Sequence, residues 1–170
     1  MYLACAPILF ASSVTAYANA FDVAIEIPAL NVAEYHRPYV ALWIEDERHQ
    51  VVSNLAVWYD GKMRNNEGEK WLKDMRQWWR RSGRTLTMPV DGVSGATKAP
   101  GQYELQFVAG QHPLTNLAAG NYRLQIEAAR EVGGRELLSI PFTWPASRPT
   151  TLTVNGEHEL GRIALTLKPE

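Results

Sequence analysis

The stretch Tyr122-Arg123-Leu124-Gln125-Ile126-Glu127-Ala128 places an apolar residue at every second position. The stretch Tyr103-Glu104-Leu105-Gln106-Phe107 repeats this alternation. A period of two is typical of a β-strand that has one face in the protein core and the other in water. These two stretches therefore predict an antiparallel β-structure.

Six further segments have the pattern of strands. The run 39–44 is apolar throughout, which is typical of a strand buried on both faces. The others are residues 21–27, 55–59, 137–142, 151–154 and 163–167. Turns such as Asp60-Gly61 and Gly133-Gly134 separate the strands. Seven or eight such strands predict that residues 21–170 form one all-β domain, an immunoglobulin-like antiparallel β-sandwich.

Residues 67–82 depart from this period and predict one inserted amphipathic helix. The apolar residues of this segment recur at helical spacing and would share the face that packs on the sheet: Trp71, Leu72, Met75, Trp78 and Trp79. Asn66 and Glu69 have the spacing of a capping box, and Gly83 would end the helix.

Charge is distributed unevenly along the chain. Residues 62–84 hold eight basic and three acidic side chains, a local charge of +5, so the remainder carries −6 and the whole chain −1. A net charge this close to zero argues against a dedicated nucleic-acid binder. The basic, tryptophan-rich insertion has two interpretations. Either its tryptophans dock it on the sheet while its arginines are solvated, or its surface binds an anionic planar ligand.

Residues 1–20 contain no charged side chain and predict a signal peptide for export. Ala18-Asn19-Ala20 is a small-x-small triplet typical of a signal-peptidase site, so the mature protein would begin at Phe21. The apolar stretch before the triplet is shorter than the roughly 20 residues that span a bilayer. Cys5 is the only cysteine, which excludes a disulfide within the chain and a thiolate zinc site.

One motif indicates a chemical function. It lies at 91–97 and reads Asp91-Gly92-Val93-Ser94-Gly95-Ala96-Thr97. It resembles the Asp-x-x-Ser/Thr-Gly-Ala-Thr flavinylation motif of bacterial FMN-binding domains in sodium-pumping quinone reductases and Rnf-type electron-transport complexes. The resemblance implies that a flavin transferase, with FAD as donor, esterifies the hydroxyl of Thr97 with the FMN phosphate. It also implies that Asp91 is the acidic recognition residue and that Ser94, Gly95 and Ala96 form the small-residue loop on which the transferase closes.

A threonine hydroxyl is a weak nucleophile until a base lies beside it, and here the transferase would supply that base. Thr97 must therefore lie on an exposed, pliable loop, which the glycines of the motif favour. In the well-known carriers the motif leads into a helix, whose N-terminus can help to hold phosphate. Here Pro100-Gly101 and the strand at Tyr103 stand in place of that helix.

A wider resemblance involves most of the chain. The order of the segments 37–46, 71–80, 91–101 and 126–131 is similar to the predicted periplasmic family catalogued as domain of unknown function 2271. The resemblance covers roughly residues 21–145. It implies a β-sandwich in the periplasm, often beside PepSY-type membrane proteins and a flavin transferase.

Together the two resemblances predict an exported carrier of covalent FMN that transfers electrons, rather than a stand-alone enzyme. Proximity in the sequence suggests that the isoalloxazine ring stacks near Trp58, Trp78 or Trp79. Cations such as Arg80 and Lys98 would stabilise reduced flavin.

Two alternatives remain open. One is a cofactor-free periplasmic binding or accessory module, which docks a partner through loop 91–101 and the aromatic helix. The other is a hydrolase or metal enzyme, which would require the cluster Glu45-Asp46-Glu47 or the four histidines to converge: His36, His49, His112 and His158. Glu127 and Glu131, beside Arg130, predict a solvated charged end of a strand.

Overall fold

The structure of the protein is a computed structural model, and it describes residues 19–114 and 117–170. The predicted signal peptide lies outside the described residues except for Asn19 and Ala20. Ala20 is the first residue of strand β1, so the predicted cleavage after Ala20 falls between the first two residues of this strand.

The described residues contain nine strands, and they confirm all eight segments that the sequence predicted. The strands are β1 (Ala20–Ile27), β2 (Tyr39–Asp46), β3 (Val51–Trp58), β4 (Ser94–Gly95), β5 (Gly101–Val108), β6 (Gly120–Ala129), β7 (Arg135–Trp144), β8 (Thr150–Asn155) and β9 (Arg162–Lys168). The additional strand, β4, lies inside the motif at 91–97.

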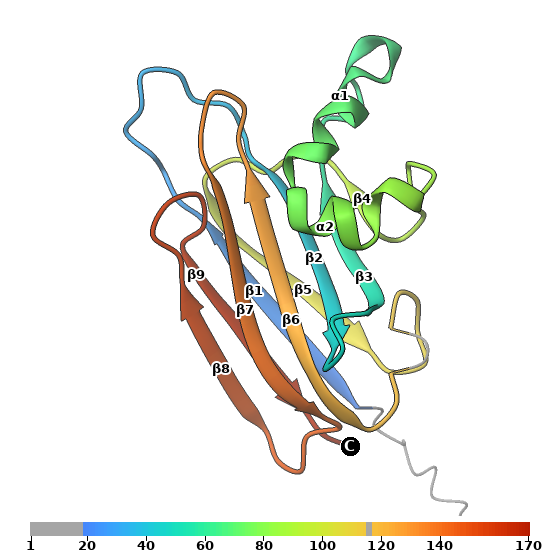
Figure 1. Cartoon of the computed structure of the whole chain (residues 1–170). Helices are drawn as coiled ribbons and strands as arrows, with labels where there is room; N and C mark the ends of the chain where they lie inside the picture. Colours follow the sequence, from blue (N-terminus) through green and yellow to red (C-terminus); the bar gives the residue numbers. More distant parts are fainter. Residues whose placement is uncertain (1–18, 115–116) are drawn as a thin grey trace, which may run out of the picture.

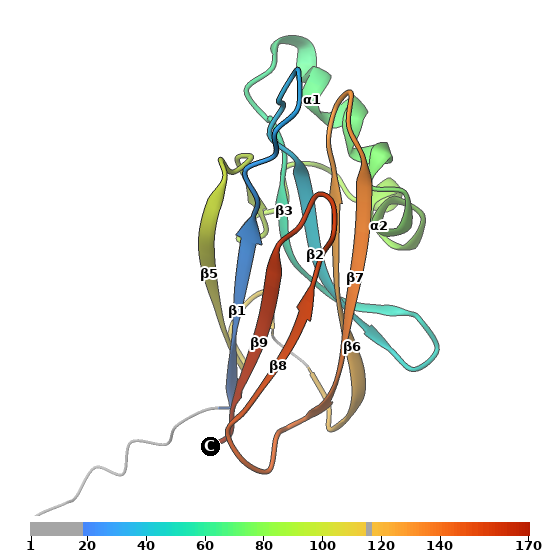
Figure 2. The same cartoon turned by 90° about the vertical axis from the view of Figure 1, so that its left-hand side faces the viewer.

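The strands form two sheets that pack face to face, which confirms the predicted β-sandwich (Figure 2). One sheet has four strands in the order β5-β1-β9-β8, and the other has five in the order β4-β3-β2-β6-β7. All pairings are antiparallel except that of β3 with β4. The main core lies between the sheets, where Phe21 contacts Phe107 and Trp144 through ring centroids 5.2 and 5.8 Å apart.

A second apolar core lies on the outer face of the five-stranded sheet. The segment between β3 and β4 covers this face beside β2 and β3 (Figure 1). Its helical turns are η1 (Arg64–Asn66), α1 (Glu67–Lys70), η2 (Trp71–Asp74), α2 (Arg76–Arg81) and η3 (Gly83–Thr85). The buried residues of this core are Ala41, Trp43, Val57, Tyr59, Leu72, Met75, Trp78, Val93 and Ala129. Strand β2 is therefore buried on both faces, as its apolar run predicted.

The insertion is helical where the sequence predicted a helix, but it is divided into short turns. Met75 has φ −76° and ψ 72°, which interrupts the helix between η2 and α2. The interruption buries Leu72, Met75 and Trp78 and leaves Trp71 42% exposed, although helical spacing placed Trp71 on the same buried face. The capping box is also absent, because Asn66 is in the left-handed region and its side chain caps no N–H.

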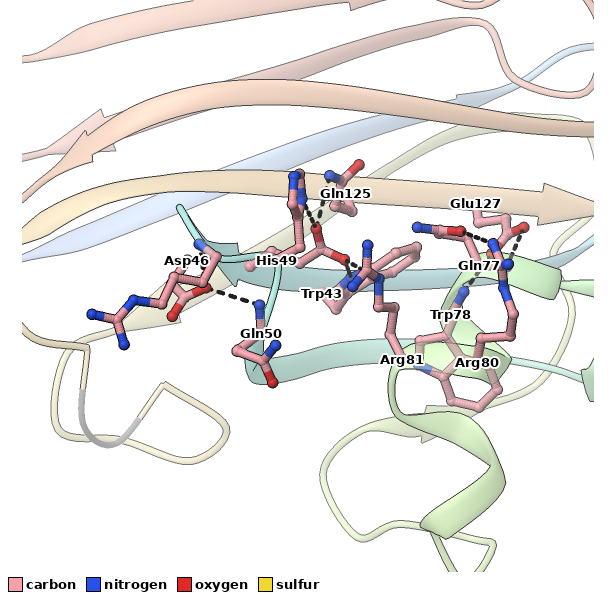
Figure 3. A network of polar contacts seen from close by, with 12 residues as sticks. Trp43, Asp46, His49, Gln50, Gln77, Trp78, Arg80, Arg81, Gln125 and Glu127 are labelled. Carbon is pink, nitrogen blue, oxygen red and sulfur yellow. Dashed lines mark hydrogen bonds and ion pairs between the residues drawn. The ribbon is translucent and has the colours of Figure 1, made fainter.

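The N-terminus of α2 is capped from the sheet by a buried carboxylate. Glu127 on β6 is 0% exposed and accepts hydrogen bonds from the backbone N–H groups of Gln77, at 3.1 Å, and Trp78, at 2.7 Å (Figure 3). Arg135 donates to the same carboxylate at 2.7 Å. The prediction that Glu127 lies at a solvated strand end is therefore wrong. Its face of β6 is polar in sequence, but the insertion covers that face and supplies the hydrogen-bond donors.

Two more polar groups of the sheet hold the insertion. Trp78 donates its indole N–H to Asn54 at 2.8 Å, and Asn54 donates in turn to Ser82 at 2.7 Å. Glu45, 1% exposed, lies 3.8 Å from Nε of Arg81 in α2. It also accepts hydrogen bonds within the sheet from Trp43 at 2.9 Å and from Gln125 at 3.3 Å (Figure 3). These bonds satisfy polar groups that burial would otherwise leave costly.

We expect Glu127→Gln to lower the free energy of unfolding by about 2 kcal/mol, because the amide lacks the charge that strengthens three hydrogen bonds and one of its oxygens becomes a donor. Urea denaturation followed by tryptophan fluorescence measures this. Glu104→Gln is the matched control on an exposed site of β5 and should stay within about 0.5 kcal/mol of wild type. Equal stability of the two variants would contradict the capping role.

Candidate functional site

The motif residues Ser94 and Gly95 form β4 at the edge of the five-stranded sheet, parallel to β3. The N–H of Val57 donates to the carbonyl of Val93 at 2.9 Å, and the N–H of Tyr59 donates to that of Gly95 at 2.9 Å. The chain from Ala96 to Pro100 has no regular structure before β5 begins at Gly101. Thr97 is therefore two residues beyond β4, in an irregular segment whose Ala99 carbonyl accepts a hydrogen bond from the hydroxyl of Tyr103 at 2.8 Å.

A tight turn precedes β4. The N–H of Val90 donates to the hydroxyl of Ser94 at 2.8 Å, and the N–H of Ser94 donates to the carbonyl of Val90 at 2.8 Å. Gly92 has φ +65°, and a Cβ there would lie 2.7 Å from the ring of His112. His112 also lies 2.9 Å from the carbonyl oxygen of Asp91, whose side chain is exposed. Ser94 thus shapes the loop through its hydroxyl.

Trp58 packs against the motif. A Cβ on Gly95 would lie 3.2 Å from Cδ1 of Trp58, a tighter contact than most Cβ atoms make. Lys98 sits over the rings of Trp58 and Tyr103, with Nζ 5.3 and 5.5 Å from their centroids. These cation–π contacts hold the residue that follows Thr97. The structure therefore brings Trp58, Lys98 and the motif together, as the sequence suggested.

Thr97 lines a pocket of about 550 Å³ at one end of the five-stranded sheet. The ends of β3 and β4, the start of β2 and the end of β6 meet there, together with the β1–β2 connection and the insertion. Thr97 is partly exposed. The residues that line the pocket with it are Tyr35, His36, Arg37, Tyr39, Asp60, Met63, Trp71, Asp74, Ala129, Arg130 and Glu131.

Arg130 is fixed in the pocket wall by a buried ion pair. Its Nε and Nη2 donate to the two carboxylate oxygens of Glu159 at 2.8 and 3.1 Å, and both side chains are less than 10% exposed. The hydrogen bond to Glu159 raises the pKa of Arg130, so the guanidinium stays charged. Burial raises the pKa values of Tyr35 and Tyr39, so both phenols are neutral at neutral pH.

The loop that carries Glu159 is held by another carboxylate, Glu136 on β7. Its oxygens accept hydrogen bonds from the backbone N–H groups of Glu157, His158, Glu159 and Leu160 at 2.7, 3.2, 2.9 and 2.9 Å. Burial alone would raise the pKa of Glu136, but these four hydrogen bonds outweigh it and the net shift is downward. Glu136 thus positions the partner of Arg130.

The other residues that the sequence placed around a flavin lie away from this pocket. Trp78 is 0% exposed in the second core. Trp79 and Arg80 line a different groove of about 550 Å³, together with Lys73, Arg76, Gln77, Arg135 and Leu137. We call this the basic groove. No carboxylate lines this groove, and of its four cations Arg135 donates to the buried carboxylate of Glu127.

The histidines are dispersed over the fold. His36 lies 2.8 Å from Glu34 and 3.6 Å from Glu131, while His49 lies 3.2 Å from Glu45. Within residues 19–114 and 117–170, no group of three or more His, Cys, Asp or Glu side chains is placed to hold a metal ion. In the same part of the chain, no helix has the length and apolar content that crossing a membrane requires.

Comparison with known proteins identifies the family. A family model described as "Predicted periplasmic protein (DUF2271)" matches residues 20–162. The chain belongs to this family. No curated protein matches it, and no solved structure matches it. The sequence resemblance to this family is therefore confirmed, and the family description supports a periplasmic location for the DUF2271 protein.

Much of the pocket that Thr97 lines was not predicted from the sequence. Tyr35 and Arg37 lie in the connection before β2, and Trp71 was assigned to a buried helical face. No local spacing links these residues to Thr97. They meet because β2, β3, β4 and β6 all reach the same end of one sheet.

We expect the stability of the DUF2271 protein to fall in acid partly through Glu136. Its pKa is below the ordinary 4.5 in the folded state, so its contribution is complete above about pH 4.5 and is lost as the pH falls through the folded-state pKa. Glu136→Gln should lower stability at pH 7 by about 1–2 kcal/mol. It should also flatten the acid limb of a plot of melting temperature against pH.

The matched control for this prediction is Glu157→Gln, an exposed residue of the same loop whose side chain does not bridge these N–H groups. An acid limb that is unchanged in Glu136→Gln would show that the four hydrogen bonds contribute nothing measurable to stability.

Proposed function

We propose that this protein is an exported electron carrier with FMN attached to Thr97 through a phosphoester. The observation that supports this most strongly is the position of Thr97, partly exposed on the wall of an aromatic-lined pocket. A threonine buried under packed neighbours would be unreachable for a modifying enzyme. The flavinylation-like motif at 91–97 supplies the second line of support.

Attachment would be a group transfer carried out by a flavin transferase. The Oγ of Thr97 attacks the phosphorus on the FMN half of FAD, so that an Oγ–P bond forms. The bond between this phosphorus and the bridging oxygen breaks, AMP leaves, and the hydroxyl proton passes to a base of the transferase. The product is stable without a thiol, which suits a protein whose single cysteine lies within the predicted signal peptide.

The geometry around the motif suits this reaction. Strand β4 fixes the motif on β3, and Thr97 is partly exposed in the irregular chain that follows. Asp91 is exposed and remains available for recognition. Gly95 packs closely on Trp58. The loop therefore combines a rigid base with a reachable hydroxyl.

The carrier would act between a membrane protein and an acceptor outside the cytoplasm. Bound FMN supplies one- and two-electron chemistry. Electrons would pass from a reduced membrane redox partner, of PepSY type in the resemblance, to the ring and then to an oxidised acceptor. A covalent bond keeps the cofactor from diffusing away, which matters in a family described as periplasmic.

A cofactor-free binding or accessory module is the second candidate, and the basic groove favours it. Lys73, Arg76, Arg80 and Arg135 surround Trp79 and Leu137, a combination that suits an acidic partner surface. Such a module would need no modification at Thr97. Protein purified from its own host would then be colourless, with no absorbance in the flavin bands.

We expect the wild-type protein, co-expressed with its flavin transferase, to gain the mass of one FMN minus one water. Intact-mass spectrometry measures the gain, and peptide mapping should place it on Thr97. Thr97→Ala should abolish the modification, and Thr97→Ser should keep part of it because the hydroxyl is retained.

Thr87→Ala is the matched control, since Thr87 is an exposed threonine on the segment that leads to the motif. This variant should be modified as fully as wild type. Wild type without the added mass, or Thr97→Ala that retains it, would overturn the proposal.

A further inference from the structure

We infer that the pocket lined by Thr97, here called the Thr97 pocket, binds the isoalloxazine ring and that Trp71 stacks on this ring. This inference rests on the proposed function and specifies which residues would hold the cofactor. It differs from the expectation drawn from sequence proximity, which named Trp58, Trp78 and Trp79. The inference rests on four of the residues that line the pocket: Thr97, Trp71, Tyr35 and Arg37.

The position of the attachment point favours this pocket. Thr97 is itself a lining residue, so the ribityl chain of a phosphoester on its hydroxyl starts at the pocket wall. The pocket volume of about 550 Å³ lies within the ~300–1,000 Å³ typical of small-molecule sites. A ring tethered this close has a high effective concentration at the pocket, so even a weak site would be filled.

The walls suit a planar aromatic system. Trp71 is 42% exposed, a large apolar side chain that the fold leaves uncovered at the interruption before α2. Tyr35 and Tyr39 are half-buried and line the same pocket from the β1–β2 connection and the start of β2. Stacking on such rings stabilises a bound planar ring beyond the burial of its apolar area. A bound ring would therefore cover the exposed face of Trp71.

The charges of the pocket select a ring over a free phosphate. Arg37 and Arg130 contribute +2 and Asp60, Asp74 and Glu131 contribute −3, which gives −1 when His36 is neutral. This balance disfavours a nucleotide phosphate but tolerates a neutral ring, whose N3–H can donate to a carboxylate. Arg37 is exposed and makes no ion pair within the described part of the chain. Its guanidinium is therefore free to donate hydrogen bonds to the carbonyl oxygens of a bound ring.

The tryptophans named from sequence proximity are less suitable. Trp78 is fully buried, and its indole N–H is bonded to Asn54. Trp79 packs against Trp78, with ring centroids 6.4 Å apart, and faces the basic groove. Trp58 is 4% exposed and is covered by Lys98. Trp71 is the tryptophan that both lines the pocket and has an exposed face.

The test compares Trp71→Leu with Trp79→Leu in protein that carries FMN. An indole stacked on an isoalloxazine ring quenches flavin fluorescence by electron transfer, and leucine keeps apolar bulk without this property. We expect Trp71→Leu to raise flavin fluorescence per bound FMN severalfold over wild type, and Trp79→Leu to leave it unchanged. Intact mass gives the bound FMN, and circular dichroism checks that each variant is folded.

The outcomes separate this inference from the proposed function. Suppose that FMN is attached but both variants fluoresce like wild type, or that only Trp79→Leu is brighter. Either result would overturn the inferred ring-binding site and leave the carrier function standing. If no FMN is attached, the carrier function fails.

The pocket can then still be tested in the unmodified protein with lumiflavin, which has no phosphate. Quenching of lumiflavin by wild type that is lost in Trp71→Leu and kept in Trp79→Leu would support a ring site, and absence of quenching by wild type would overturn it.

Discussion

The buried carboxylate of Glu127 is the interaction on which the arrangement of this protein depends. The outer face of the five-stranded sheet presents Ala41, Trp43 and Val57, so something must cover it. The insertion between β3 and β4 does so, but its helices are too short to be stable alone. Glu127 compensates by binding the free N–H groups of Gln77 and Trp78. One carboxylate thus caps a helix and fixes it on the sheet.

This attachment also places the candidate site. The insertion leaves the sheet after β3 and returns at β4, so its anchoring determines where the motif pairs with β3. The interruption at Met75 leaves Trp71 facing the pocket that Thr97 lines. On the far side, Glu136 holds the loop of Glu159, and Glu159 holds Arg130. Two walls of the pocket are therefore set by carboxylates, the buried Glu127 on β6 and the half-buried Glu136 on β7.

The strands could be predicted because a period of two is a local property, and all eight predicted segments are strands. Whether a strand face is exposed or covered is not a local property of the sequence. Glu127 alternates with Leu124, Ile126 and Ala128 as a solvated residue would, yet another segment covers it. Strand β4 was missed because two residues carry no period. Helical spacing placed Trp71 inside because it assumes one straight helix, which Met75 interrupts.

The irregular chain after Thr97 bears on how a flavin would be held. In the resembling carriers a helix follows the motif, and its N-terminus can bind phosphate. Here Ala96 to Pro100 is irregular, and Lys98, the nearest cation in sequence, is engaged by Trp58 and Tyr103. A phosphate that is esterified to Thr97 needs no separate anion site, since the covalent bond fixes it. The binding free energy can then come from contacts of the ring alone. The aromatic residues of this pocket would supply those contacts.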